Sequence, residues 1–230
     1  MQSKWGGDMA VIGFDVYGTL VDPLAMSAPL TAVAGELAAE MAAVWRAKQL
    51  EYSFRRTLMG LYENFDVCTR DALRFAAAST GVMLSDDEEQ RLMGAYLDLE
   101  PYPDVIPGLG QLQAAGHTAV AFSNGVEASL RVLLGRAGVL PHLDGIVSVD
   151  AVQAFKPHPA VYHHLAEQLE SPRAETWLVS SNYWDVMGAR QAGLRAAWLR
   201  RVESAVRDPW GLEPHVIIGS LAELPGHVDQ

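Results

Sequence analysis

Apolar runs alternate with helix-like patterns along most of the chain and predict a parallel sheet flanked by helices. The first run, residues 9–14, predicts a buried strand that ends at Asp15, and the turn signal Gly18-Thr19 follows. From residue 103 onward strands and helices alternate, which is typical of an α/β fold with helices on both faces of the sheet. The predicted helices are 105–115, 127–137, 159–169 and 185–192, and the predicted strands are 117–122, 146–149, 176–179, 195–199 and 215–218.

A different pattern fills the stretch between the first strand and residue 98. Apolar residues recur at mostly helix-like spacing over 29–58, and two further helices are predicted over 69–79 and 86–97. Gly81 predicts a helix end, and Ser85-Asp86 predicts a helix start. We therefore expect a core domain made of residues 1–20 and 99–230, with residues 21–98 inserted as an all-helical cap. Its place directly after the loop of Asp15 suits a lid.

Polar residues follow several of the predicted strands. Ser123-Asn124, Lys156 and the string 180–185 each come at or after the end of a strand. Ligands bind outside the carboxyl ends of the strands in open parallel sheets, so these side chains are expected to converge on Asp15.

Composition narrows the class of protein. The chain has 230 residues, of which 50% are hydrophobic and 20% charged, so it can bury a core and is not a disordered chain. A formal net charge of −11 argues against nucleic acid and anionic membrane surfaces as partners. The single cysteine, Cys68, excludes an internal disulfide framework and a multi-cysteine metal site.

The location of the protein is also an expectation from the sequence. No apolar run approaches the roughly 20 residues of a membrane span. Residues 1–8 lack the apolar stretch of a secretion signal. We therefore expect a cytoplasmic protein.

Four motifs in order carry a family resemblance: Asp15-x-x-Gly-Thr-Leu, Ser123-Asn124-Gly125, Lys156-Pro157 and Ser-Ser-Asn-Tyr-Trp-Asp at 180–185. Together they resemble the haloacid dehalogenase superfamily, in which the aspartate is a nucleophile. The stretch 45–52, with Leu-Met-Gly at 58–60 and Asn-Phe at 64–65, resembles the cap of the type II, L-specific 2-haloacid dehalogenases. The resemblance extends from Phe14 to about Leu221 and implies a Rossmann-like, doubly wound core with an inserted helical cap.

The residue two positions after Asp15 separates two kinds of chemistry. Phosphatases of this superfamily have a second aspartate there, whereas this chain has Tyr17. A tyrosine, with an unperturbed pKa of about 10, supplies no equivalent carboxylate, so phosphoryl transfer is disfavoured. The resemblance implies instead that Asp15 displaces halide from carbon and forms an ester that water opens. A halide leaves without a proton, but it needs donors where its charge develops.

The resemblance assigns the remaining roles. Arg46, Asn124 and Trp184 would hold the leaving halide, and the substrate carboxylate would be held by Ser123 and the backbone amides of Val16 and Tyr17. Lys156 would keep Asp15 or Asp185 ionised, and Lys156, Asn182 and Asp185 would position or activate the water. The other expected site residues are Thr19 and Ser180 in catalysis, and Leu50, Phe65 and Tyr162 in substrate binding.

Plainer interpretations of these residues stay open at this point. Arg46 could be a surface helix arginine, Ser-Asn-Gly a simple turn, and Asp185 a helix N-cap. Asp15 and Asp185 are the only nearby acids, which is too few carboxylate ligands for a typical Mg²⁺ site. Neither a metal nor a cofactor is therefore expected.

The activity expected from the resemblance is hydrolysis of L-2-haloacids to D-2-hydroxy acids, with a small 2-haloacid anion as the partner and a homodimer formed through the cap. The alternatives are a Mg²⁺-dependent phosphatase acting on a small phosphate ester and a non-catalytic binding protein on the same scaffold.

Overall fold

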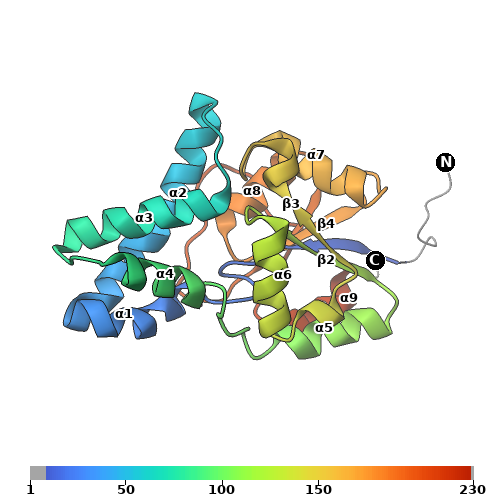
Figure 1. The fold of residues 1–230 in the computed structure, drawn as a ribbon. Helices are drawn as coiled ribbons and strands as arrows, with labels where there is room; N and C mark the ends of the chain where they lie inside the picture. The colour runs from blue at the N-terminus through green and yellow to red at the C-terminus, as the bar shows by residue number, and fades with distance from the viewer. Residues whose placement is uncertain (1–8, 229–230) are drawn as a thin grey trace.

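Six parallel strands form one sheet in the order β3-β2-β1-β4-β5-β6 (Figure 1). The computed structural model describes residues 9–228, so the segment 1–8, on which the secretion-signal expectation rests, lies outside the described residues. The strands are β1 (Val11–Phe14), β2 (Thr118–Ser123), β3 (Gly145–Ser148), β4 (Thr176–Ser180), β5 (Arg195–Leu199) and β6 (Val216–Ile218). The predicted doubly wound α/β fold is confirmed.

Helices cover both faces of this sheet. Helices α7 (Pro159–Gln168) and α8 (Tyr183–Gln191) lie on one face, and α5 (Val105–Ala114) and α9 (Pro225–Val228) lie on the other (Figure 1). Helix α6 (Glu127–Arg136) connects β2 to β3. All four residues of β1 are buried, as expected for a central strand covered on both sides.

Close packing at β1 requires a glycine. A Cβ atom added at Gly13 would lie 2.7 Å from Cδ2 of Leu165, which comes from α7. The helix therefore sits directly against the strand that ends at Asp15, and this contact fixes the strand beneath the site.

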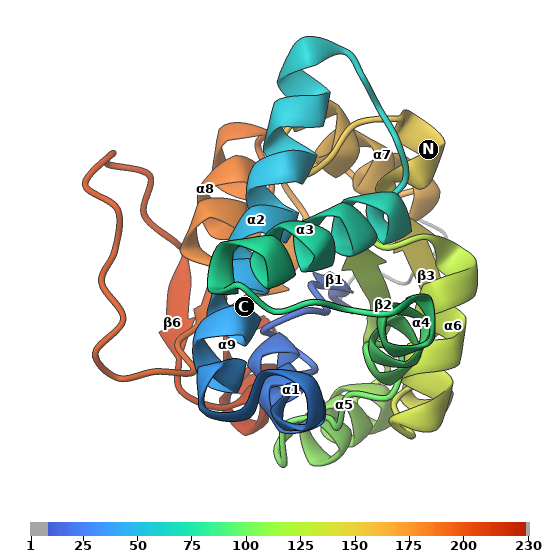
Figure 2. The ribbon, with the colours of Figure 1, turned by 60° about the vertical axis from the view of Figure 1, so that its left-hand side comes forward.

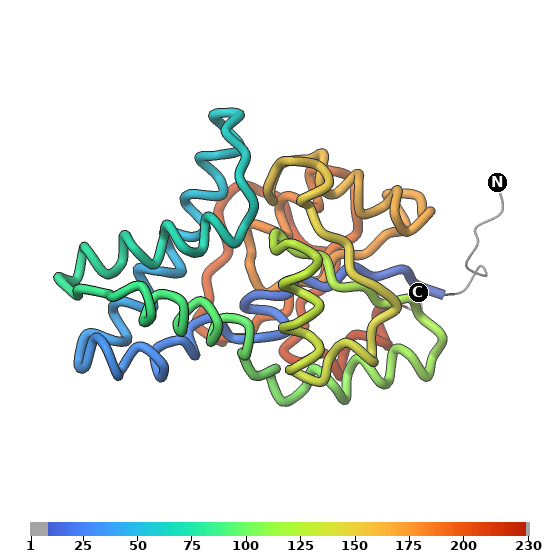
Figure 3. The backbone as a smooth tube through the Cα atoms, in the orientation of Figure 1, coloured from blue at the N-terminus to red at the C-terminus, as the bar shows by residue number. Residues whose placement is uncertain are grey.

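Four helices lie between β1 and α5 in the chain. They are α1 (Ser27–Ala34), α2 (Ala38–Met59), α3 (Phe65–Thr80) and α4 (Asp86–Ala95). Figure 2 shows α2 and α3 in front of the sheet, and in Figure 3 the path of the chain through all four helices stays to one side of it. None of the helices in residues 9–228 has the length and apolar character needed to cross a membrane.

Two boundaries within these helices differ from the prediction. The helix predicted over 29–58 is broken at Gly35, whose φ of +52° is a left-handed conformation that glycine adopts readily. Helix α3 begins at Phe65 rather than at residue 69, because the Asn64 side chain accepts a hydrogen bond from the Val67 amide and caps the helix there. The predicted helix end at Gly81 and the helix start at Ser85 are confirmed.

Candidate active site

Asp15 follows β1 directly and is 6% exposed. Its Oδ2 accepts hydrogen bonds from Thr19 Oγ1 at 2.8 Å, Ser180 Oγ at 3.2 Å and Asn182 Nδ2 at 2.7 Å. These donors come from the loop after β1, the last residue of β4 and the residue before α8. The adjacent parallel strands β1 and β4 thus bring donors from two segments of the chain to one carboxylate oxygen, as the sequence predicted.

Lys156 lies between two carboxylates. Its Nζ is 3.1 Å from Asp15 Oδ1 and 3.0 Å from Asp185 Oδ2, and it also donates to the Phe122 carbonyl at 2.8 Å. The lysine is only 1% exposed. Lys156 therefore contacts both acids rather than one, and its side chain separates the two carboxylates.

Asp185 is completely buried, and both of its oxygens accept hydrogen bonds. Tyr162 donates to Oδ1 at 2.7 Å, and Lys156 donates to Oδ2. The N-cap alternative for Asp185 is wrong, because Asn182 is the N-cap of α8 and Asp185 lies in the first turn with its side chain on Lys156 and Tyr162. Burial, with the nearby charge of Asp15, raises the pKa of Asp185 despite the opposing effect of Lys156.

Arg46, from the inserted helix α2, reaches the loop of Asp15. It donates through Nη2 to the Tyr17 carbonyl at 3.2 Å and through Nη1 to Gln49 Oε1 at 2.8 Å. Asn182 donates to the same Tyr17 carbonyl at 3.0 Å and also to Asp15. The guanidinium is therefore half-buried against the loop that carries Asp15, and Arg46 is not a plain surface residue of α2.

Gln49 is a positioning residue that the sequence analysis missed. It is fully buried, donates to Thr69 Oγ1 at 2.7 Å and accepts from Tyr96 at 2.9 Å as well as from Arg46. The signal was the three-residue spacing from Arg46, which places both side chains on one face of a helix. Gln49 thereby ties the arginine to α3.

A small cavity of about 10 Å³ lies over Asp15. Eight side chains line it: Asp15, Tyr17, Arg46, Leu50, Phe65, Ser123, Asn124 and Trp184. All eight had been predicted as site residues. The volume is close to the roughly 10–15 Å³ that one water needs, so a substrate requires the cavity to open.

Two of the residues expected to bind substrate do not line the cavity. Tyr162 contacts Asp185 from below, and Val16 is buried in the core; neither lines the cavity. Tyr162 therefore supports the carboxylate network rather than reaching the cavity in this conformation.

Ser123 is the last residue of β2, Asn124 follows it, and both line the cavity. Ser123 Oγ accepts from the Gly125 amide at 3.2 Å, so the turn interpretation also holds for this motif. Asn124 Oδ1 accepts from the Lys156 amide at 2.9 Å. Because that bond occupies the amide oxygen, the amide offers its donor group to the cavity.

Tyr17 belongs to an aromatic cluster at the roof of the site. Its ring centroid is 5.8 Å from that of Phe65 and 5.3 Å from that of Tyr96. Burial, together with Tyr96 and Asp66, raises the pKa of Tyr17 well above its usual value, so the phenol stays protonated. Within residues 9–228, no three His, Cys, Asp or Glu side chains are grouped so as to hold a metal ion.

Comparisons with known proteins agree with this geometry. The family model of haloacid dehalogenase-like hydrolases matches residues 9–193. (S)-2-Haloacid dehalogenase 1 of Pseudomonas sp. (strain CBS-3) is 38% identical over 212 residues, which are 92% of this chain and 93% of that protein. The chain belongs to the (S)-2-haloacid dehalogenase family. The resemblance drawn from the motifs is confirmed.

A solved member of this dehalogenase family has the same architecture. The L-2-haloacid dehalogenase of Xanthobacter autotrophicus aligns with a TM-score of 0.90 and 31% identity, covering 95% of this chain and 97% of that chain. The same relative has also been solved with chloropropionic acid covalently bound, with the same TM-score of 0.90.

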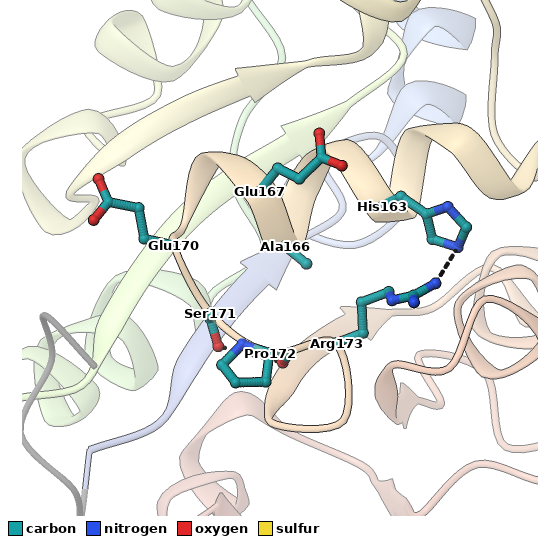
Figure 4. A pocket seen from close by; sticks show the side chains of 7 residues that line it. All are labelled: His163, Ala166, Glu167, Glu170, Ser171, Pro172 and Arg173. Atoms are coloured by element: carbon teal, nitrogen blue, oxygen red, sulfur yellow. Dashed lines mark hydrogen bonds between the residues drawn. The ribbon is translucent and has the colours of Figure 1, made fainter. Parts of the chain in front are cut away.

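A second depression in this dehalogenase-family chain, of about 420 Å³, lies at the end of α7 (Figure 4). His163 points toward Arg173 there, with Nε2 3.0 Å from the guanidinium Nη1 (Figure 4). The depression shares no lining residue with the cavity over Asp15.

Proposed function

We propose that the protein hydrolyses L-2-haloacids to D-2-hydroxy acids, with Asp15 as the nucleophile. The observation that carries the proposal is a buried, multiply hydrogen-bonded carboxylate below a cavity lined by Arg46, Asn124 and Trp184. The names of the relatives, and the covalent chloropropionic acid complex of one of them, support the same reaction.

The two oxygens of Asp15 have different surroundings. Oδ2 accepts three hydrogen bonds, whereas Oδ1 accepts one, from Lys156. Oδ1 therefore keeps more lone-pair density and is the attacking atom. It forms a bond to C2 opposite the halogen, the carbon–halogen electron pair leaves with the halide, and C2 is inverted. Arg46, Asn124 and Trp184 receive the halide, while Ser123 and the Val16 and Tyr17 amides hold the substrate carboxylate.

The second step opens the ester at the aspartyl carbon. Water attacks Cγ of Asp15, and negative charge develops on Oδ2, where Thr19, Ser180 and Asn182 already donate. Such preorganised donors stabilise a tetrahedral intermediate. The hydroxy acid leaves, Asp15 regains its carboxylate with one water oxygen, and a proton is released. Asp185 helps to position the water through Lys156, since both of its own oxygens are engaged. This cycle uses no metal or cofactor.

The division into domains is part of the proposal. The core spans residues 1–20 and 99–230, of which the structure describes 9–20 and 99–228, and residues 21–98 form a cap that supplies Arg46 and Leu50. The closed form is held by a hydrogen bond from Tyr62 to Asp150 Oδ1 at 2.6 Å and by one from the Phe155 amide to Thr57 at 3.0 Å. Because the cavity has room for about one water, the cap opens to admit substrate. We also propose a homodimer through the cap helices, in the cytoplasm.

The test is release of chloride from L-2-chloropropionate in the presence of EDTA. We expect metal-independent release that Asp15→Asn abolishes. Phosphate release from an aryl phosphate that requires Mg²⁺ and stops with EDTA would instead identify a phosphatase, and absence of any turnover would identify a binding protein. Either result overturns the proposal.

A further inference from the structure

A larger groove of about 830 Å³ lies beside the catalytic cavity, between α2 and α8. Most of its lining is apolar. The residues that matter here are Phe54 and Leu58 of α2, Trp184, Met187 and Gln191 of α8, and Trp210. None of the roles assigned above uses this volume.

One face of α2 runs from the catalytic cavity into the groove. Arg46 and Leu50 line the cavity, and Phe54 and Leu58 line the groove. Residues four apart lie on the same side of a helix, and each step of four advances about 6 Å along its axis. The stripe therefore begins over Asp15 and, turning about 40° around the helix axis at each step of four, ends at the exposed Leu58 at the outer end of the groove.

Helix α8 repeats this arrangement from the other side. Trp184 lines both the cavity and the groove, and Met187 and Gln191 continue along the groove at helical spacing. Helices α2 and α8 lie side by side in Figures 1 and 2, in agreement with the edge-to-face contact of Phe54 and Trp184, whose ring centroids are 5.3 Å apart. Trp184 is thus the common wall of the two spaces.

The outer end of the groove exposes apolar side chains. Leu58 is 86% exposed, and Trp210, in the loop between β5 and β6, is 73% exposed. This loop stands out beside α8 in Figure 2. Apolar surface that is continuous with a reaction site favours an apolar ligand, because burying that surface removes it from water.

We propose that this groove binds the apolar tail of 2-haloacids longer than 2-halopropionate. The inference rests on the proposed function. The substrate carboxylate lies at Ser123 and C2 lies over Asp15, so a longer side chain passes Trp184 and continues between Phe54 and Met187. The catalytic cavity has no room for such a tail, and the ammonium of Lys156 in the groove lining is engaged by Asp15 and Asp185.

The experiment compares kcat/KM for the (S)-2-bromo acids of propionate, hexanoate and octanoate. Each buried methylene contributes roughly 0.8 kcal/mol, so the native protein should gain up to about fourfold per added methylene. Met187→Trp fills the groove and should remove this gain while retaining activity on 2-bromopropionate. Gln191→Trp, at an exposed position, gives a second variant whose folding is unaffected and should reduce the gain for octanoate. Val132→Trp, exposed on α6, is the matched control and should leave the chain-length profile unchanged.

The outcomes separate this inference from the proposed function. No turnover of 2-bromopropionate by the native protein overturns the proposed function. Turnover of 2-bromopropionate without a gain for longer acids overturns the groove proposal alone. An unchanged chain-length profile in both groove variants also overturns the groove proposal alone. If the native protein is a dimer in light scattering and those variants are monomers, the groove is occupied by a second copy of the chain.

Discussion

Replacing Lys156 by methionine removes the ammonium that lies between Asp15 and Asp185 while keeping most of the volume of the side chain. The two carboxylates are 6% and 0% exposed, so the change leaves them buried without the cation that both contact. Removal of one partner from a buried ion pair typically destabilises a protein by about 3–5 kcal/mol. We expect a loss of that size in the free energy of unfolding at pH 8.

The loss should depend on pH. Burial and Asp15 already raise the pKa of Asp185, and removal of the opposing Lys156 charge raises it further. A carboxyl whose pKa is higher in the folded than in the unfolded state stabilises the fold at low pH, and that contribution is lost as pH rises through the folded pKa. The Lys156→Met substitution should therefore cost less at pH 5 than at pH 8, because a raised pKa favours proton uptake by Asp185 as the pH falls.

The assay is urea denaturation followed by circular dichroism at both pH values, together with chloride release. Lys48→Met is the matched control, because Lys48 forms a partly exposed pair with Glu51 and such pairs contribute about 0–1 kcal/mol. A loss for Lys156→Met below about 1 kcal/mol at pH 8, or an equal loss at the two pH values, would refute the reasoning. Restoration of part of the stability by adding Asp185→Asn would support it.

Three further substitutions test other parts of the structure. Asn182→Ala removes a donor from Asp15 Oδ2 and should lower kcat by about 10²–10³, with accumulation of the aspartyl ester in mass spectrometry; a fall of less than about tenfold would contradict its role. Ser85→Ala removes the capping box of α4 and should cost about 1 kcal/mol in urea denaturation, with Ser85→Thr as a control that keeps the hydroxyl. Gly13→Ala places a Cβ 2.7 Å from Leu165 and should cost about 1–3 kcal/mol; Leu165→Ala is itself destabilising because Leu165 is fully buried, so the double variant should lose less than the sum of the two single losses if the clash is the cause.

The periodicity of the sequence was sufficient to predict the sheet and most of the helices, because buried parallel strands and amphipathic helices have distinct hydrophobic patterns. It failed where one residue overrides a pattern. Gly35 interrupts an apolar repeat that continues on both sides of it, and the break depends on a backbone conformation rather than on hydrophobicity. Asn64 could have marked the start of α3, since asparagine is a favoured N-cap.

For the site, the motifs were sufficient to predict the eight residues that line the cavity. They were not sufficient to predict the hydrogen-bond partners of the buried residues around it. Asp185 was open to an N-cap interpretation because its sequence position allows one, and only the fold shows both of its oxygens engaged by Lys156 and Tyr162. Gln49 was missed although it lies three residues from Arg46, because its spacing places it on the same face of the helix without showing its buried partners. Its role depends on Thr69 and Tyr96, which are distant in sequence.

The outer turns of α2, at Phe54 and Leu58, and the hydrogen bonds around Asp15 belong to different stretches of the chain, and this separation affects how the protein can evolve. Mutations at the outer turns of α2 alter which molecules fit without disturbing the groups that make and break bonds. Selection for new substrates can therefore change the outer turns of α2 while the residues around Asp15 stay the same.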